Sequence, residues 1–194
     1  MGDVAPTRNM ALENLPQDLP APIDDGGADH LTGMALPAVT LTATNGDQVT
    51  LSEIGGRVVI YIYPMTGRPG VALPDGWEQV PGARGCTPQS CSFRDHFQEL
   101  QGLNTSVFGL STQDTPYQQE AKERLHLPFE MLSDEGFKLR ETLNLPMMDP
   151  DLVAGLILYK RLTIIANNSI IEKVFYPVFP PDKNIDDVLD YLNG

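Results

Sequence analysis

The sequence predicts an α/β fold in which helices flank a central mixed β-sheet. Residues 38–51 are typical of a β-hairpin, because two β-prone runs are joined by Asn45-Gly46, a pair that favours a tight turn. A strand, a helix and a second strand follow over residues 57–111, and residues 161–176 form another hairpin pattern. Hairpins pair strands antiparallel and a strand–helix–strand unit pairs them parallel, so the sheet is expected to be mixed.

The remaining strands are expected from the residues that form them. Residues 57–63 are a continuous run of β-branched and aromatic residues, which suits a strand that is buried on both faces. Residues 106–111 form a second apolar strand, and 129–132 a brief extended segment. The last hairpin joins strands at 161–166 and 170–176 through three polar residues.

Helices are expected at 115–125, 137–143 and 185–192. Asp182 or Asn184 is expected to cap the last of these, because short polar side chains satisfy the free N–H groups of a helix start.

Residues 1–35 are expected to form an arm ahead of a single domain that spans 36–194. The arm has four prolines, six acidic residues and one arginine, with little hydrophobic periodicity. It either packs on the domain through Leu12, Leu15 and Leu19 or is mobile, and the sequence leaves both possibilities open. A domain of this length is large enough to bury a hydrophobic core.

Composition excludes several classes of function. The formal net charge is −13 and the isoelectric point about 4.4, which disfavours binding to nucleic acid or to anionic membranes. No apolar run is long enough to span a membrane, and the N-terminal stretch lacks the pattern of a secretory signal. Two cysteines in 194 residues suggest functional thiols in a reducing compartment, so we expect a cytoplasmic protein.

A helix is expected to begin just after Cys86. Apolar residues recur at helical spacing from there as far as Leu103. Thr87 or Ser90 is expected to cap this helix, and Pro88 suits its first turn. The order is therefore strand, long loop, cysteine and helix, with the thiol at the carboxyl end of a central strand, where α/β sheets bind ligands.

This position favours a reactive thiol. Free N–H groups and the helix dipole stabilise the thiolate, so Cys86 is expected to be nucleophilic at neutral pH. Cys91 lies five residues further along the same helix, about 7.5 Å in rise and about 140° in rotation away. A disulfide between them requires the first turns to unwind. The alternative is a pair of ordinary buried, inert helix cysteines.

Several short segments match a known family in order and spacing. They are Tyr63-Pro64, Gly85-Cys86-Thr87 with a second cysteine five residues on, Ser92-Phe93-Arg94-Asp95, Gly109-Leu110-Ser111, Leu127-Pro128-Phe129, Leu132-Ser133-Asp134 and Arg161-Leu162-Thr163-Ile164-Ile165. Over residues 36–193 the chain resembles the peroxiredoxins, specifically the bacterioferritin-comigratory-protein or PrxQ-like group. The resemblance implies a thioredoxin-like fold of the peroxiredoxin type, with an extra N-terminal β-hairpin.

The resemblance also implies an activity. Cys86 would reduce hydrogen peroxide or an organic hydroperoxide and become a sulfenic acid, and Cys91 would then form an intramolecular disulfide with it. A dithiol reductant such as thioredoxin would restore the thiols, and no metal or organic cofactor would be needed. Monomer and homodimer both remain possible.

The chain departs from the family pattern just before Cys86. Gln79 and Ala83 stand where the family has a proline and a threonine. The simplest explanation is an insertion at 67–84, which turn-forming residues dominate. Pro64 would then still shield the thiol, and Thr66 would supply the hydroxyl that the family threonine gives to the peroxide. The insertion itself would be a lid, a partner surface or a loop without a role.

One arginine matches the catalytic arginine of the family. Arg161 precedes a late strand, where its charge would stabilise the thiolate and hold the peroxide oxygens. Without the resemblance, a surface arginine at a strand end would be the simpler interpretation. Arg84 competes for the same electrostatic role, and Gln89, one turn into the helix, matches a supporting polar position.

Three other functions stay open. A thiol–disulfide oxidoreductase on the same fold is one, although that class usually separates its cysteines by two residues. A second is an inactive interaction module, because no threonine stands at Ala83. The third is a peroxidase in which Cys91 is a bystander. Metal and nucleotide cofactors have no support, because the three histidines lack ligand spacing and no phosphate-binding glycine motif occurs.

Overall fold

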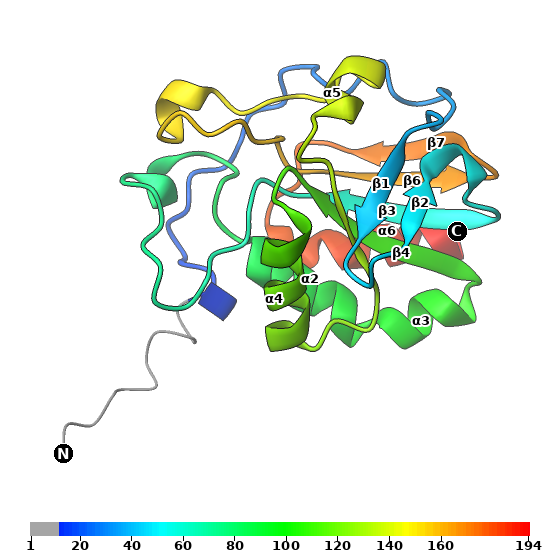
Figure 1. The fold of residues 1–194 in the computed structure, drawn as a ribbon, viewed down its shortest axis with the longest axis horizontal. Helices are drawn as coiled ribbons and strands as arrows, with labels where there is room; N and C mark the ends of the chain where they lie inside the picture. The colour runs from blue at the N-terminus through cyan, green and yellow to red at the C-terminus, as the bar shows by residue number, and fades with distance from the viewer. Residues whose placement is uncertain (1–11) are drawn as a thin grey trace.

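The computed structural model describes residues 12–194 and forms a seven-stranded mixed sheet with helices on both faces (Figure 1). The strands are β1 (Thr40–Ala43), β2 (Gln48–Thr50), β3 (Arg57–Ile62), β4 (Thr105–Ser111), β5 (Met131–Ser133), β6 (Leu162–Asn167) and β7 (Ile170–Phe175). Their order across the sheet is β2-β1-β5-β4-β3-β6-β7. The predicted mixed α/β fold is confirmed, and so are both hairpins.

Strand β3 lies inside the sheet between β4, which runs parallel to it, and β6, which runs antiparallel. Its side chains alternate between two hydrophobic cores, as the period of two of a strand requires. Val58, Ile60 and Ile62 belong to one core, and Val59 and Tyr61 to the other. Burial on both faces explains why the strand reads as a continuous apolar run.

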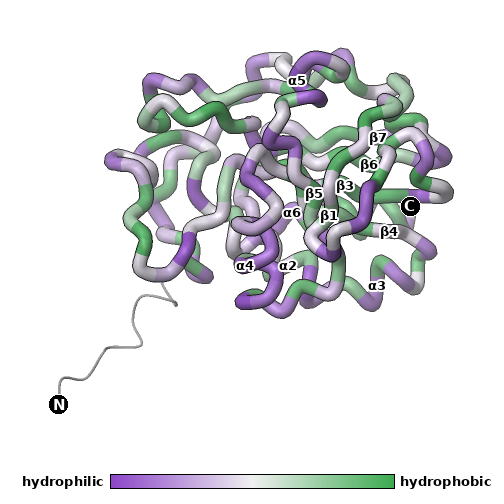
Figure 2. The backbone as a smooth tube through the Cα atoms, in the orientation of Figure 1, coloured by the Kyte–Doolittle hydropathy of each residue, from purple (hydrophilic) through white to green (hydrophobic). Residues whose placement is uncertain are grey.

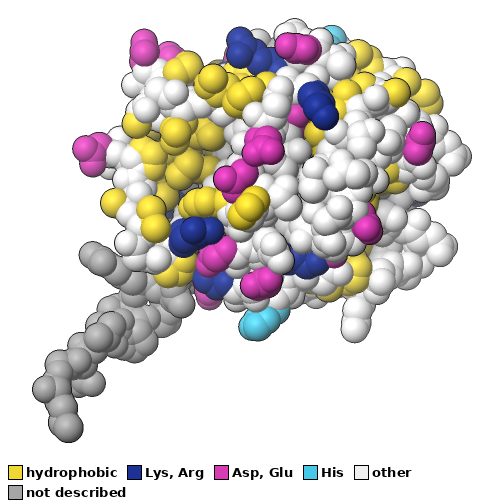
Figure 3. Space-filling model, viewed as in Figure 1, with side chains coloured by type: hydrophobic (Ala, Val, Ile, Leu, Met, Phe, Trp, Pro, Cys, Tyr) yellow, Lys and Arg dark blue, Asp and Glu magenta, His cyan; other side chains and the backbone are white. Residues whose placement is uncertain are grey.

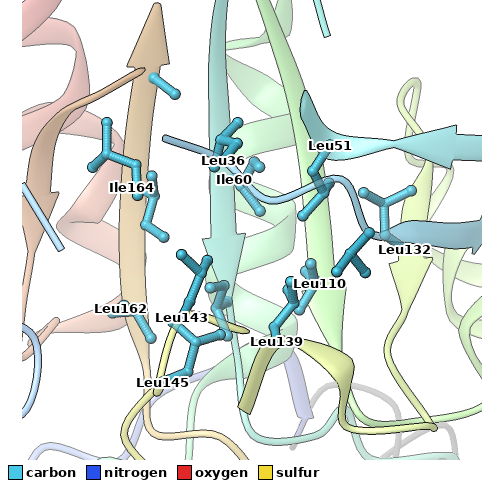
Figure 4. Close-up of a cluster of buried hydrophobic side chains, with 14 of the residues drawn as sticks. Leu36, Leu51, Ile60, Leu110, Leu132, Leu139, Leu143, Leu145, Leu162 and Ile164 are labelled. Atoms are coloured by element: carbon cyan, nitrogen blue, oxygen red, sulfur yellow. The ribbon is translucent and has the colours of Figure 1, made fainter. Parts of the chain in front are cut away.

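The first core lies on the face of the sheet covered by α5 (Lys138–Thr142) and by irregular segments. Figure 4 shows leucines and isoleucines from β3, β4, β5 and β6 meeting Leu139, Leu143 and Leu145. Leu31 also belongs to this core and is fully buried, although it precedes the first strand. The segment just before the domain therefore contributes to the core.

The second core is covered by helices. These are α2 (Cys86–Asp95), α3 (Phe97–Gly102), α4 (Thr115–Leu125) and α6 (Asn184–Asn193). In Figure 1 α2, α3 and α4 lie below the sheet and α6 lies behind β3 and β4. Figure 2 shows α4 mainly in hydrophilic colours and the strands mainly in hydrophobic ones. Within residues 12–194, no helix is both long and apolar enough to cross a membrane.

Two helix starts differ in how they are capped. Asp114 accepts a hydrogen bond from the N–H of Tyr117 and caps α4 as a good N-cap residue does. The predicted cap of α6 is wrong: Lys183 stands at that position without a side-chain bond, because Asp182 lies in a 3₁₀ turn that runs directly into the helix. Asn184 instead turns its side chain into the protein, where it is 1% exposed.

The long loop between β3 and α2 has a small core of its own. Trp77, in the 3₁₀ helix η2 (Trp77–Gln79), packs with Val80 and Ala83 and with apolar residues of the 148–158 segment. Trp77 is 3% exposed, so the loop is packed against the domain through this side chain. On the face in Figure 3, hydrophobic side chains gather at the left, over this loop and the segment near residue 150.

The described part of the arm packs on the domain. Leu12, Leu15 and Leu19 are each half-buried. Further along, Ala35 forms an antiparallel bridge with Ile170, next to the edge strand β7. Of the two possibilities left open by the sequence, the packed arm is the one that residues 12–35 adopt.

Candidate active site

Cys86 is the first residue of α2, as the sequence predicts, but its cap is different. The prediction that Thr87 or Ser90 caps the helix is wrong, because the N-cap is Gly85 and no side chain bonds there. Gly85 has a φ of 109°, and a Cβ atom there would lie 2.7 Å from Pro181 and 2.9 Å from Leu15. Only glycine fits both this backbone and this space, so the turn that presents the thiol depends on it.

The thiol of Cys86 is buried against a guanidinium group. Its Sγ lies 3.1 Å from Nη2 of Arg161, and both residues are 3% exposed. Nη2 also donates to the carbonyl oxygens of Gly82, Ala83 and Arg84 at 3.2–3.3 Å. The backbone before α2 therefore holds the guanidinium in place, and its positive charge meets the sulfur away from water, where electrostatic attraction is strong.

A buried polar chain extends from Arg161 to the last helix. Nη1 of Arg161 donates to Oε1 of Gln89 at 2.6 Å, and Nε2 of Gln89 donates to Oδ1 of Asn184 at 3.1 Å. The hydroxyl of Thr163 donates to the same Asn184 oxygen at 2.6 Å. Gln89 is one of the predicted site residues, whereas Thr163 is not, and Asn184 was predicted only as a helix cap. An asparagine at a helix start was the one available signal.

Arg84 does not compete with Arg161 for the thiol. Its side chain lies 3.5 Å from the carboxylate of Glu78 and donates to the carbonyl oxygen of Asn14. Arg84 is thus directed to the long loop and the arm, whereas its own carbonyl accepts from Arg161. Of the two predicted arginines, the structure brings Arg161 to the sulfur.

Thr66 is buried, but its described contacts do not run to Cys86. Its hydroxyl donates to Oε1 of Gln113 at 3.2 Å, and its carbonyl accepts from Tyr117. Pro64 is buried at the end of β3. The residue beside the thiol is Ala83, whose carbonyl oxygen lies 3.8 Å from Sγ. The structure therefore connects Thr66 to the residues after β4, and a hydroxyl role for Thr66 stays a prediction.

Cys91 lies inside the same helix as Cys86, and both are free thiols. Burial raises the pKa of the Cys91 thiol, and the acidic Glu13 and Asp95 act in the same direction, against the opposing effect of Arg94. With α2 wound, the two thiols lie on one helix at the spacing that excludes a disulfide.

Side chains between and beyond the cysteines anchor α2. The ring of Phe93 stacks on Tyr61 with centroids 4.6 Å apart, and the hydroxyl of Tyr61 donates to Ser90 at 3.1 Å. Ser92 donates to the carbonyl oxygen of Asp182 at 2.7 Å. The helix ends at Asp95, so the apolar pattern that predicts one continuous helix is divided between α2 and α3.

The described residues provide no cluster of three or more histidine, cysteine, aspartate or glutamate side chains that could hold a metal ion. Within residues 12–194, the reactive groups brought together are instead a thiol, a guanidinium, an amide and backbone carbonyls. This set suits nucleophilic attack by sulfur on an electrophile that Arg161 can hold.

Two solved structures resemble this fold. A peroxidoxin BcpB from Mycobacterium tuberculosis aligns with a TM-score of 0.66 at 23% identity, covering 84% of this chain and 96% of the other. A peroxiredoxin Q from Xanthomonas campestris aligns with a TM-score of 0.64 at 18% identity, covering 91% and 97%. At these identities the likeness concerns the fold.

Sequence comparisons identify the family to which the chain belongs. The family model described as Redoxin matches residues 31–189. The chloroplastic peroxiredoxin Q of Suaeda salsa is 32% identical over 163 residues, which is 84% of this chain and 67% of that protein. Its counterpart in Oryza sativa subsp. japonica is also 32% identical and is covered over 66% of its length, so the chain spans about two-thirds of these relatives. The chain therefore belongs to the redoxin family and, within it, to the PrxQ-like peroxiredoxins.

Proposed function

We propose that this chain is a thiol peroxidase that reduces hydrogen peroxide or organic hydroperoxides through Cys86. The observation that carries the proposal is the 3.1 Å contact between Sγ of Cys86 and Nη2 of Arg161 at the start of α2. The Cys86 thiolate attacks the terminal peroxide oxygen and the O–O bond breaks. The leaving oxygen takes up the proton that the thiol has lost and departs as water or an alcohol. Cys86 is left as a sulfenic acid.

Arg161 serves this step as a fixed positive charge. As the O–O bond lengthens, negative charge develops on the leaving oxygen, and a guanidinium already in place stabilises that charge without reorganising. Gln89 holds the other arm of the guanidinium at 2.6 Å, and Asn184 in turn fixes Gln89. We assign Gln89 a positioning role, because its described contacts run to Arg161 and Asn184 and not to the sulfur.

Cys91 then resolves the sulfenic acid. Its thiolate attacks the oxidised sulfur of Cys86, hydroxide leaves and takes up a proton as water, and an intramolecular disulfide forms. The first turns of α2 unwind beforehand, which breaks the contacts of Gln89 and Ser90. A thioredoxin-type dithiol restores both thiols by exchange. This cycle suits a reducing compartment, and the cytoplasm stays the predicted location.

Thiol counting tests this function. The reduced protein receives one equivalent of hydrogen peroxide, and its free thiols are counted over time beside a small free thiol at the same concentration. We expect both protein thiols to disappear together and much faster than the reference thiol. Reaction no faster than the reference would exclude the peroxidase and leave a thiol–disulfide oxidoreductase or an inactive module of the same fold.

The resolving step should depend on pH. The pKa of Cys91 is raised while α2 is wound. Protonation of this thiol therefore stabilises the wound helix, fully so below the ordinary thiol pKa of about 8.5. That stabilisation is lost as the pH rises through the raised pKa, so alkaline conditions favour both unwinding and the attacking thiolate. Disulfide formation after rapid oxidation should therefore accelerate between about pH 7 and pH 10, by up to about tenfold per unit. Stopped-flow kinetics would measure it, and a flat profile would contradict this account.

A further inference from the structure

The arm that precedes the domain reaches the start of α2. Leu15 packs against Gly85, the N-cap of this helix, and its Cδ2 lies 2.9 Å from the place of a Cβ atom at residue 85. Pro181 contacts the same glycine, with its Cγ 2.7 Å from that place. In Figure 1 the dark blue start of the described chain lies beside the teal loop that leads into α2. The N-cap of α2 is therefore held between a proline of the domain and a leucine of the arm.

Two more contacts join this part of the arm to the long loop at 67–84. The carbonyl oxygen of Asn14 accepts a hydrogen bond from Nη2 of Arg84 at 3.3 Å. Leu12 packs against Gly67, since its Cδ2 lies 2.8 Å from the place of a Cβ atom there. Gly67 is the first residue of the loop and Arg84 is the last. The Leu12–Leu15 segment therefore contacts both ends of the loop as well as the N-cap of α2.

The same segment places a carboxylate near the second thiol. Burial is the main cause that raises the pKa of Cys91, and the charges of Glu13 and Asp95 add to it. Arg94 and Arg124 act in the opposite direction. Of these charged groups, Glu13 comes from the arm, Arg94 and Asp95 from α2, and Arg124 from α4. The arm thus disfavours the thiolate of Cys91, which is the form that attacks the sulfenic acid.

These contacts belong to the wound form of α2. A disulfide brings the side chains of Cys86 and Cys91 together, which requires the first turns to unwind. Gly85 is bonded directly to Cys86, so its backbone moves when Cys86 moves and separates from Leu15 and Pro181. Contacts that are present before unwinding and lost during it stabilise the wound form and raise the barrier to the resolving step.

We propose that the Leu12–Leu15 segment holds α2 in its wound form and slows disulfide formation, with Leu15 as a positioning residue that acts through Gly85. The proposal rests on the proposed peroxidase function and concerns the control of its second step. Attack of Cys86 on the peroxide takes place with α2 wound and needs no change in the arm. The later step, in which the sulfur of Cys91 displaces hydroxide from Cys86, requires the arm to release the helix. The arm therefore sets how long the sulfenic acid persists.

Leu15→Ala tests the proposal, because it removes the side chain that contacts Gly85 from a half-buried site. Leu19→Ala is the matched control: Leu19 lies in the same arm, is also half-buried and is not among the side chains nearest Gly85. Each reduced protein is mixed with hydrogen peroxide and quenched with acid at intervals, and its intact mass is measured. Sulfenic acid formation adds an oxygen atom, whereas disulfide formation leaves the protein lighter by two hydrogen atoms, so the two steps are timed separately.

We expect Leu15→Ala to form the disulfide about three- to tenfold faster, with oxidation of Cys86 within about twofold of the wild type, because a partly buried aliphatic contact is lost from the wound form alone. The control should change neither rate. Leu15→Met restores an apolar side chain of similar size and should return disulfide formation to the wild-type rate. Disulfide formation that is unchanged or slower in Leu15→Ala, or equally accelerated in Leu19→Ala, would overturn the proposal.

Hydrogen exchange tests the proposal without any peroxide. In the reduced protein, the amide hydrogens of α2 should exchange faster in Leu15→Ala than in the wild type or in Leu19→Ala, whereas those of α3 should not change. Equal protection of α2 in the three proteins would show that Leu15 does not hold the helix, and would overturn the proposal with the peroxidase function intact. A wild type that reacts with hydrogen peroxide no faster than a free thiol would overturn that function, and the exchange result would still decide whether the arm holds α2.

Discussion

Replacing Cys86 with serine should leave a protein whose remaining thiol survives one equivalent of hydrogen peroxide. A serine hydroxyl stays protonated at neutral pH and is a far weaker nucleophile than a thiolate, so the first step is lost. Cys91 cannot take it over, because its pKa is raised by burial and it lacks the guanidinium contact that Cys86 has. The expected count is one thiol before and one thiol after the addition.

Replacing Cys91 with serine should separate the two halves of the cycle. Cys86 is oxidised at an unchanged rate, since its contact with Arg161 remains, but no intramolecular disulfide forms. Turnover with a thioredoxin-type donor should stop, and excess peroxide should carry Cys86 to sulfinic acid, seen by mass spectrometry as a gain of two oxygen atoms. Sustained turnover would instead make Cys91 a bystander and an external thiol the resolving group.

Replacing Arg161 with lysine should slow oxidation of Cys86 by about 10²–10³-fold, the usual cost of removing one preorganised donor from a site of developing negative charge. Lysine retains the charge, but its compact ammonium lacks the planar fork that contacts Gln89 through Nη1 and the sulfur through Nη2. The measurement is the second-order rate constant with hydrogen peroxide, obtained by stopped flow at several pH values.

Arg84→Lys is the matched control for this change. Arg84 is also buried, at 8% exposed, but its side chain contacts Glu78 and Asn14 and not the sulfur. We expect its rate constant to stay within about threefold of the wild type, well below the loss of one such donor. Equal losses in the two variants would show that Arg161 acts through the fold, and thermal unfolding of both proteins would reveal that effect independently.

Much of the fold could be predicted because its signals are local. The burial of β3 on both faces produces an unbroken apolar run, and the Asn45-Gly46 turn sets the first hairpin. Helix α4 has the bounds that the sequence predicts, Thr115–Leu125, and the residue just before it, Asp114, is of a type that commonly caps helices. The caps of α2 and α6 were predicted wrongly because tertiary contacts override local preference. Pro181 and Leu15 leave no room for a side chain at Gly85, and the side chain of Asn184 accepts hydrogen bonds from Gln89 and Thr163.

The site was predictable only in part. Cys86 and Arg161 each lie in a short segment that matches the family, and the structure brings their side chains together. Asn184 carries no such motif, because its role depends on packing between α6, α2 and β6. The cavity of about 430 Å³ that Arg161 lines is harder still to predict, since its walls come from segments more than a hundred residues apart. Periodicity records which face of an element is buried but not which distant loop it meets.

The division between α2 and α3 at His96 limits the size of the cooperative unit that must open for the disulfide to form. Beyond the break, Leu100 is fully buried in the same core as Val107 of β4, so α3 is held by the sheet. The nine residues of α2 that carry an amide hydrogen, all except Pro88, can therefore exchange it through a local opening that leaves α3 protected. Hydrogen exchange should show α2 as a separate low-stability segment, and the redox cycle then involves one short foldon and not the whole helical layer.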